Sequence, residues 1–579
     1  MFKKLLSILI IIACLGFDSC AKPDIKNGNT TNSGNSSQVS LTEINGTKIV
    51  EGNNLIGLVA DETGKGIAGV PVSDGYTFTT TDDNGVYQFK ANHYCRKVYI
   101  SLPAEYEIPL DDEKKMPLFF STNKIDRRVV NRNDFELRKL ANPTDEFTLI
   151  AIGDPQCRTS SDVERFTKET MVDLNETVIS EQSSGNYLNA FALTLGDIIF
   201  DKIEQWDPMV KSLSNVKIND GKYLPIFNCI GNHDHNAAES NDFKATNLYV
   251  EKLGPTDYSF NRGKAHIIVM DNVFCTKSWD TTWEYGGGYS EQQINWLKQD
   301  LELVKDKQDK VVFFAGHIPF RGGSTKDDGS SINKARYYDE VLTLLEQFHE
   351  AHILIGHTHY QQNYIHTDHI TKSGKPVYEH IHGAACGAWW SSNLCVDGTP
   401  NGYSFYEVKG NTVYNWVAKG TRLPKNHQMR VYNGNDIYTG SQNYSFGWVE
   451  GGYGGKGNYH APGKDVYKNA FVAKIWNCDP SWKVELIVDN KAYPMKMMGE
   501  YQTDMCTASF FYNEVNKNSA TYLKRLNHFW YCTAPCGDPS KEKNWEVRAT
   551  QTIPGSQHQN VYSSSSFQKD FSTFAIGDL

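Results

Sequence analysis

Short hydrophobic runs recur through the middle of the chain, and each ends at a polar residue or at glycine followed by one. The five runs are 147–152, 191–195, 226–230, 311–315 and 353–355. Apolar runs without alternation predict strands that are buried on both faces. Apolar residues at helical spacing predict helices between them, two of which span 292–304 and 337–349. Strands and helices in this order predict a two-sheet α/β sandwich.

Short alternating segments on either side of this region predict two β-rich domains. The candidate strands before it are 55–60, 66–73, 76–81, 85–90 and 97–102, with a tight turn at Asp83-Asn84-Gly85. Regular short strands in under a hundred residues predict a β-sandwich. After residue 410 the helical periodicity fades, and alternation at 411–418, 470–475 and 484–488 predicts a second β-rich domain.

The N-terminus reads as a targeting segment. Lys3 and Lys4 precede an apolar stretch that is too short to span a bilayer, and Cys20 follows. The segment resembles a bacterial lipoprotein signal with a lipid on Cys20, although Cys14 offers a competing site and plain secretion is the alternative. We therefore expect an exported, membrane-anchored lipoprotein, periplasmic or on the cell surface. Residues 22–47, rich in Asn, Ser, Thr and Gly, predict a flexible tether.

At 579 residues the chain is long enough for two to four domains. The expected division is a signal peptide at 1–19, a linker at 20–48, a β-sandwich at 49–142, the α/β domain at 143–410 and a β-rich domain at 411–579. The net charge is −10 and no basic cluster is present, so nucleic acid is not an expected partner. The sequence leaves the oligomeric state open.

The polar residues that follow the five runs are potential metal ligands. Carboxylate, amide and imidazole groups in this number can hold a pair of divalent ions. The residues are Asp154 and Gln156, Asp197, Asn232 with His233 and Asp234, His317, and His357 with His359. Their order closely resembles that of the calcineurin-like metallophosphoesterase superfamily, except that Gln156 stands where that family has a histidine.

The resemblance implies a four-layer α/β sandwich and hydrolysis of phosphoesters by a hydroxide that bridges two metal ions. It assigns Asp154, Gln156 and His359 to one ion. It assigns Asn232, His317 and His357 to the other, with Asp197 bridging. His233 would then lie near the leaving group as general acid or electrostatic stabiliser, and Asp234 would orient its ring. Asp201 could instead accept a hydrogen bond from His233, or be a plain surface acid.

Gln156 affects which metal is expected. An amide oxygen is a harder ligand than imidazole and favours Mn²⁺ or Fe²⁺ over Zn²⁺, although Gln156 could also leave the metal unbound. Phe200, three residues after Asp197, replaces the tyrosine ligand of purple acid phosphatases and excludes their charge-transfer iron site. We expect activity; the alternative is a degenerate, non-catalytic protein that binds phosphate or glycan.

The expected substrate is a small phosphorylated molecule, a monoester or a diester. Asn232 and His233 would contact it, and Trp389 and Trp390 could offer faces to a sugar or base, unless they are core residues. Arg321, Gln361 and Asn363 are weaker candidates for contacting the phosphate.

Overall fold

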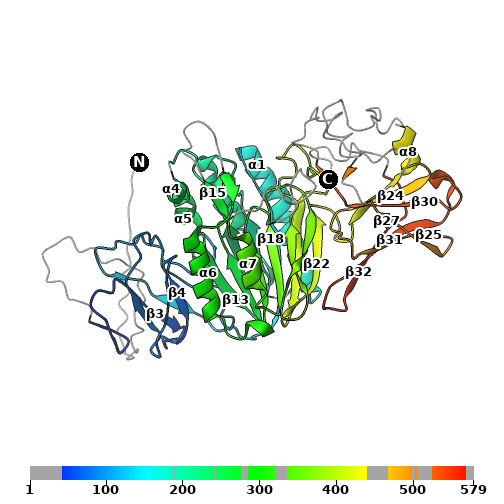
Figure 1. The fold of residues 1–579 in the computed structure, drawn as a ribbon. Coiled ribbons are helices and arrows are strands. Elements are labelled where there is room, and N and C mark those ends of the chain that lie inside the picture. The colour runs from blue at the N-terminus through cyan, green and yellow to red at the C-terminus, as the bar shows by residue number, and fades with distance from the viewer. Residues whose placement is uncertain are drawn as a thin grey trace, which may run out of the picture.

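The computed structural model describes residues 42–187, 189–239, 241–275, 285–320, 336–439, 467–498, 502–504 and 524–568. The molecule is elongated, with an N-terminal β-domain, a central α/β domain and a C-terminal β-domain in succession along its length (Figure 1). The predicted signal peptide and Cys20 lie outside the described residues. Among the helices of the described part, none combines the length and the apolar character needed to cross a lipid bilayer.

The central domain is built on two sheets. The first contains β10 (Glu146–Ile152), β11 (Phe191–Leu195), β12 (Ile226–Cys229), β21 (Gly402–Lys409) and β22 (Thr412–Gly420). Its order is β12-β11-β10-β21-β22, in which β10, β11 and β12 are parallel and the last two strands are antiparallel. The second contains β13 (Tyr258–Arg262), β14 (Ala265–Val269), β17 (Val311–Ala315), β18 (Glu350–Ile355), β19 (Gln362–Ile370) and β20 (Pro376–Ile381).

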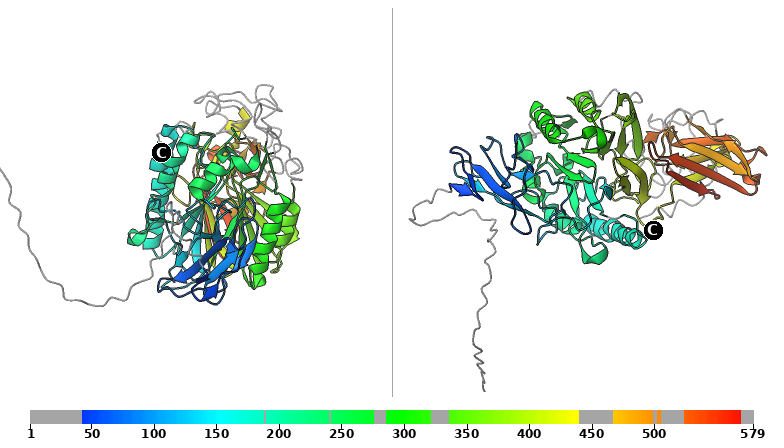
Figure 2. Two further views of the ribbon diagram at one scale, coloured as in Figure 1. Left: turned by 90° about the vertical axis from the view of Figure 1, so that its left-hand side faces the viewer. Right: turned by 90° about the horizontal axis from the view of Figure 1, so that it is seen from below.

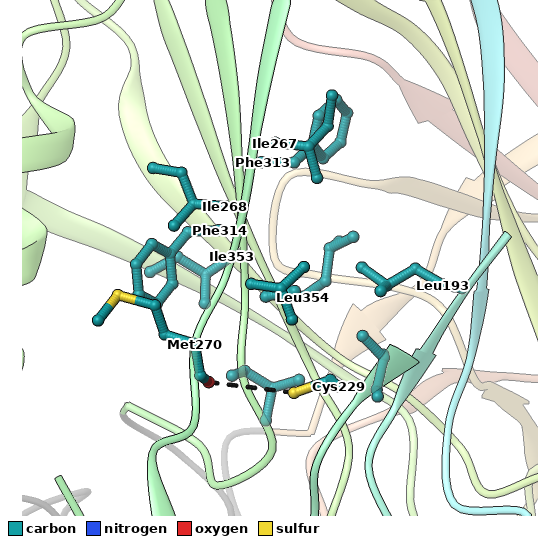
Figure 3. Close-up of a cluster of buried hydrophobic side chains, with 14 of the residues drawn as sticks. Leu193, Cys229, Ile267, Ile268, Met270, Phe313, Phe314, Ile353 and Leu354 are labelled. Atoms are coloured by element: carbon teal, nitrogen blue, oxygen red, sulfur yellow. Dashed lines mark hydrogen bonds between the residues drawn. The ribbon is translucent and has the colours of Figure 1, made fainter. Parts of the chain in front are cut away.

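The second sheet has the order β13-β14-β17-β18-β20-β19. Its four inner strands are parallel and its two outer strands antiparallel. Successive residues on these strands point to opposite faces, and both faces are buried. Phe313 and Leu354 point toward Leu193 of the first sheet, while Phe314 and Ile353 point the other way (Figure 3). The prediction that the apolar runs are strands buried on both faces is confirmed.

Helices cover the outer faces of both sheets and complete four layers (Figures 1 and 2). The first sheet packs against helices whose buried apolar side chains form one hydrophobic cluster with those of the sheet. The second sheet packs against the two helices predicted at 292–304 and 337–349. The helices are α1 (Ser160–Arg165), a π-helical segment Phe166–Met171, α2 (Val172–Ser183), α3 (Trp206–Leu213), α4 (Asp242–Ala245), α5 (Asn247–Leu253), α6 (Glu291–Leu303) and α7 (Tyr338–Leu345). The predicted α/β sandwich is thus confirmed.

The N-terminal domain is a small β-sandwich, as predicted. One sheet has the order β6-β3-β8 with β9 also on β3, and the other is β5-β4-β7. A hairpin precedes them within the predicted linker 20–48, and its Ile44 is buried against Ile56 and Val86. The strands are β1 (Glu43–Ile44), β2 (Thr47–Lys48), β3 (Leu55–Asp61), β4 (Pro71–Ser73), β5 (Phe78–Thr80), β6 (Val86–Phe89), β7 (Tyr99–Ile100), β8 (Asn131–Arg132) and β9 (Phe135–Leu137).

This domain is fixed to the central domain by packing and hydrogen bonds. Trp296 of α6 is buried, stacks near Phe78 with ring centroids 5.4 Å apart, and donates its indole N–H to Ser73 Oγ. Leu102 forms a β-bridge with Phe260 of β13, the edge strand of the six-stranded sheet. The interface thus continues the hydrophobic core of the central domain.

The C-terminal domain is also a β-sandwich, but it begins later than predicted. Residues 412–420 form β22 and pair with β21, so they belong to the central sheet and not to the C-terminal domain. An alternating strand has the same sequence pattern in either domain, which is why the pattern misplaced the boundary at 410. Its sheets are β23-β24-β30-β27 and β26-β25-β31-β32.

The bounds of the remaining elements complete the chain. They are β15 (Val273–Cys275), β16 (Tyr285–Gly287), β23 (Met429–Asn433), α8 (Gly434–Thr439), β24 (Ala470–Ile475), β25 (Lys483–Val488), β26 (Lys491–Pro494), β27 (Lys496–Met497), β28 (Gln502–Thr503), β29 (Arg525–Leu526), β30 (Phe529–Thr533), β31 (Trp545–Thr552) and β32 (Gln559–Ser564).

A chain of buried polar side chains runs through the central domain and ends at the C-terminal domain. His352 contacts Glu350 and His380 at 2.8 and 2.9 Å. His380 contacts Asn363 Oδ1 at 2.9 Å, and Asn363 donates to the carbonyl of Asn477 in the C-terminal domain. A buried chain of this kind stabilises a structure only when every member finds its partner.

Candidate metal centre

The predicted ligands lie together at one edge of the molecule's central sandwich. Each of the strands β10, β11, β12, β17 and β18 ends at a predicted ligand or just before one, and in the parallel strands these ends share one edge. Both sheets therefore contribute donors to a single site. The ends of the five strands, and the predicted ligands that follow them, therefore converge.

Glycine precedes the ligands because the strand ends approach one another closely. A Cβ at Gly196 would lie 2.5 Å from His317 Nδ1, and one at Gly231 would lie 2.1 Å from the backbone N of Asp197. A Cβ at Gly356 would lie 2.7 Å from Asp154 Oδ2. The repeated Gly-Asp, Gly-Asn and Gly-His pairs thus make room for a compact site.

The backbone at the ligands is also unusual. Five predicted ligands have a positive φ in the left-handed region, which is uncommon for residues other than glycine. Such strain concentrates at functional sites, where the surrounding structure holds it in place. They are Asp154 (43°), Gln156 (44°), Asp197 (51°), His357 (72°) and His359 (57°).

Four of the predicted ligands form the tighter half of the site, which we call the first position. Ligand atoms of Asp197, His317 and His357 all lie within 4.8 Å of one another. Asn232 Oδ1 lies 3.0 Å from both His317 Nε2 and His357 Nδ1, and these two nitrogens are 3.2 Å apart. Two imidazole nitrogens, an amide oxygen and a carboxylate converge on one point.

The remaining predicted ligands form a looser group, which we call the second position. His359 Nε2 lies 3.7 Å from Asp154 Oδ1. Both carboxylate oxygens of Asp154 accept the backbone N–H of His357 at 2.9 Å. Gln156 is buried beside them, but its amide Nε2 donates to Asp197 Oδ2 at 2.9 Å.

The electrostatics of the site suit a cation. Burial raises the pKa of Asp154 well above its usual range. Burial alone would also raise the pKa of Asp197, but His317 and His233 lower it, so that this carboxylate stays ionised. Burial, with His317 nearby, lowers the pKa of His357 to about 3, and burial lowers that of His359 to about 4. Both imidazoles are therefore neutral at pH 7 and able to ligate.

The donor set fits divalent metal ions. Burying carboxylates costs free energy unless a cation or proton compensates them, and here two carboxylates and three imidazoles face each other. The amide Nδ2 of Asn232 is buried without a hydrogen-bond partner in the described structure. Its oxygen therefore remains directed at His317 and His357, as a metal ligand requires.

His233 lies beside the first position. Its backbone N–H donates to Asp197 Oδ1, and its side chain keeps about a fifth of its area exposed. The ring meets Phe200 edge to face, with centroids 4.3 Å apart. Burial alone would lower the pKa of His233, but the negative charges of Asp197 and Asp201 outweigh burial, so the pKa is raised above its usual value. A protonated imidazole at this place can donate a proton.

The carboxylate that hydrogen-bonds to the His233 ring is Asp201, the alternative partner given from the sequence, and the predicted role of Asp234 is wrong. His233 Nδ1 lies 2.8 Å from Asp201 Oδ1. Asp234 is buried, and its carboxylate accepts the backbone N–H groups of Ile198, Ile199 and Gly231. A carboxylate that takes three backbone hydrogen bonds holds the loops together and is not free to orient a ring.

The two tryptophans differ from each other. Trp389 packs over His359 with ring centroids 4.6 Å apart, so it borders the site. Trp390 is 5% exposed, donates its indole N–H to the carbonyl of Pro155 and contacts Phe166 edge to face. Trp390 therefore offers no face to substrate, and the alternative that it is a core residue is confirmed.

The weaker phosphate candidates do not reach the site where the structure describes them. Gln361 and Asn363 are buried and donate to the side chain or backbone oxygen of Asn477. Arg321 lies outside the described residues. Sequence reasoning missed Tyr285, whose ring meets His357 edge to face at 5.8 Å. No glycine-ligand motif accompanies it, so only the fold could bring it to the site.

The fold and this convergence of ligands define a metal-dependent phosphoesterase architecture, and the comparisons with known proteins agree. Residues 147–361 match the family model of calcineurin-like phosphoesterases. Residues 53–140 and 379–555 match the models for the N-terminal and C-terminal regions of such proteins. The chain belongs to the calcineurin-like phosphoesterases.

Other comparisons are less informative. No curated protein matches the sequence. Among solved structures, a purple acid phosphatase from seeds of yellow lupin (Lupinus luteus) matches with a TM-score of 0.31 and 12% identity. The match covers 48% of this chain and 54% of that chain, so it spans about half the length of the lupin protein.

Proposed function

We propose that this protein hydrolyses phosphoesters with the help of two divalent metal ions. The observation that carries the proposal is the convergence of Asp197, His317 and His357 on one point, with Asn232 Oδ1 between the two rings. The bound ions would supply a nucleophile derived from water and would neutralise charge on the phosphoryl oxygens. Mn²⁺, Fe²⁺ and Zn²⁺ are the candidates.

The chain's own residues have separate tasks in this proposal. Asp197 would hold both ions, since it lies within reach of the first position and accepts a hydrogen bond from Gln156 beside the second. Asn232 directs its oxygen to the first position and leaves its buried N–H₂ group for a phosphoryl oxygen. His233, held by Asp201, donates a proton to the leaving oxygen. None of these side chains needs to form a covalent bond with phosphorus.

The test combines metal analysis with hydrolysis of p-nitrophenyl phosphate and of its bis-ester. We expect metal in the purified protein and turnover that a chelator abolishes and added metal restores. Asp197→Asn should abolish turnover and reduce bound metal. The preferred ester would decide between monoesterase and diesterase. A protein that holds no metal and hydrolyses neither ester after supply of Mn²⁺, Fe²⁺ or Zn²⁺ would support the non-catalytic phosphate- or glycan-binding alternative.

We also propose that the protein acts outside the cytoplasm, anchored through a lipid on Cys20. The support is the Lys3-Lys4 start, the apolar stretch and the cysteine that follows it. Metabolic labelling with a palmitate analogue should label the wild type and not Cys20→Ser. Label retained by Cys20→Ser but lost in Cys14→Ser would move the lipid to the competing site.

A further inference from the structure

The amide of Gln156 is oriented by its neighbours on both sides. Its backbone N–H donates to the carbonyl of Asp197 at 2.7 Å, and its side-chain Nε2 donates to Asp197 Oδ2 at 2.9 Å. At the other end of the amide, the thiol of Cys386 lies 3.9 Å from Oε1. The side chain is only 3% exposed, so solvent offers little alternative.

Chemistry fixes this orientation. An ionised carboxylate only accepts hydrogen bonds, so it requires the N–H₂ end of the amide. Turning the amide over would place an acceptor against Asp197. The carboxylate therefore fixes the arrangement in which the oxygen, the only atom of Gln156 that could bind metal, lies on the side of the Cys386 thiol.

The two metal positions are consequently unequal. The first position has four donors within about one coordination sphere: Asp197, Asn232, His317 and His357. The second has Asp154 and His359, whose nearest ligand atoms are 3.7 Å apart, and shares Asp197. Without a ligand at position 156, the second ion has one protein donor fewer than the first.

We propose that Gln156 is not a metal ligand but a positioning residue that fixes the bridging carboxylate of Asp197. It follows that the protein binds one divalent ion tightly and a second ion at least tenfold more weakly. The inference rests on the proposed function only in that both need metal at this site.

The test is a calorimetric titration of Mn²⁺ into the metal-free mature protein and two variants. Gln156→Leu keeps the volume and removes the donor. Because Asp197 serves both positions, we expect the tight ion to weaken by about tenfold, as loss of an outer hydrogen bond to a ligand does. His359→Ala should weaken only the second ion. If Gln156→Leu instead leaves the tight ion unchanged and weakens only the second, Gln156 is a ligand and the proposal fails.

A gain-of-function variant gives independent evidence. Gln156→His supplies the missing imidazole, and we expect the second ion to bind at least tenfold more tightly, since imidazole is a good ligand for these metals. An unchanged second ion would overturn the claimed inequality of the two positions. Gln299→Leu on α6 is a matched control: Gln299 hydrogen-bonds to Tyr76 and Asn295, so both dissociation constants should stay the same. Circular dichroism confirms that each variant is folded.

The same titrations separate this inference from the proposed function. Ions bound as predicted, with neither ester hydrolysed, would refute the hydrolase and leave the role of Gln156 standing. If the protein hydrolyses an ester and Gln156→Leu weakens only the binding of the second ion, the hydrolase is supported and the proposed role of Gln156 is refuted. A protein that binds none of Mn²⁺, Fe²⁺ and Zn²⁺ would refute both.

Discussion

At the scale of single residues, His233 shows that the sequence leaves the choice between two partners open. The motif Gly-Asn-His-Asp favoured the neighbouring Asp234 as the residue that orients the histidine, and Asp201 was the alternative. In the folded chain Asp234 points into the loop backbone, and Asp201, from another strand end, reaches the ring. The ligands themselves were identifiable because each follows an apolar run. A hydrogen-bond partner that a loop brings to the ring does not directly follow one of the five apolar runs, so the sequence pattern does not single it out.

The first prediction concerns His233. His233→Ala should lower kcat by roughly 10²–10⁴-fold for alkyl phosphates, whose poor leaving groups need a proton. The loss should be much smaller for p-nitrophenyl phosphate, because p-nitrophenolate leaves without one. Rates with a series of leaving groups measure the difference.

Asp201→Asn is the companion variant, and it should show the same trend with a smaller loss. Metal content should be normal in both variants, since neither residue is among the predicted ligands. A His233→Ala loss that is equal for all leaving groups would mean that the histidine stabilises charge and transfers no proton.

The second prediction concerns His528, a buried histidine of the C-terminal domain. Burial and the nearby Lys474 lower its pKa to about 3, against about 6.5 in an unfolded chain. The unfolded state therefore takes up the proton first as the pH falls, and stability is lost below about pH 6.5. Between pH 7 and pH 5, wild type should lose about 1–2 kcal/mol more unfolding free energy than His528→Asn. Urea unfolding at both pH values measures this; equal losses would contradict the buried neutral state.

At the scale of elements, the sequence predicted long elements well and short ones poorly. Helices α6 and α7 and the apolar strands are near their predicted places, because burial on one or both faces leaves a clear pattern. The short strands β8 and β9 were missed, since two or three residues carry no periodicity. β22 was predicted as a strand but assigned to the wrong domain, because the sequence of a strand does not show which strand it pairs with.

The third prediction concerns the ion pair between β24 and the loop after Trp390. Lys474 and Asp397 are both fully or almost fully buried, and Nζ lies 3.1 Å from Oδ2. Removing one partner leaves the other charge buried and unpaired, which costs about 3–5 kcal/mol. Lys474→Met and Asp397→Asn should each destabilise by that amount.

The double variant decides how the two charges interact. Lys474→Met combined with Asp397→Asn should cost clearly less than the sum of the single changes, because neither buried charge is then left alone. Additive losses in denaturant unfolding would show that the two residues act independently.

At the scale of the whole molecule, the three domains behave as one folded unit. A single hydrophobic cluster includes Val72 of the N-terminal domain, Trp296 of the central domain and Val472 of the C-terminal domain. The sequence predicted two β-rich domains on either side of the α/β domain. Composition and alternation identify such domains, but they do not reveal the surfaces through which domains pack.

The fourth prediction is that the central domain does not fold well alone. Deleting residues 49–142 would expose Trp296 and the edge strand β13, which now lies against Leu102. We expect insoluble or aggregated protein. In the full chain, Trp296→Ala should lower the unfolding free energy by about 3–5 kcal/mol. Soluble yield, light scattering and thermal unfolding are the measurements. A soluble, monomeric deletion variant with unchanged metal binding would show that the N-terminal domain is dispensable for folding.

The buried polar chain from Glu350 to Asn477 restricts how this sequence can change in evolution. Each member contacts the side chain of the next, the last link running from Asn363 Nδ2 to Asn477 Oδ1 at 3.2 Å, so a single substitution leaves a neighbour without that partner. Drift at one of these positions is tolerated only with a matching change at another. Across relatives that keep both domains, residues 352, 363, 380 and 477 should therefore covary, and the C-terminal domain should be inherited together with the catalytic one.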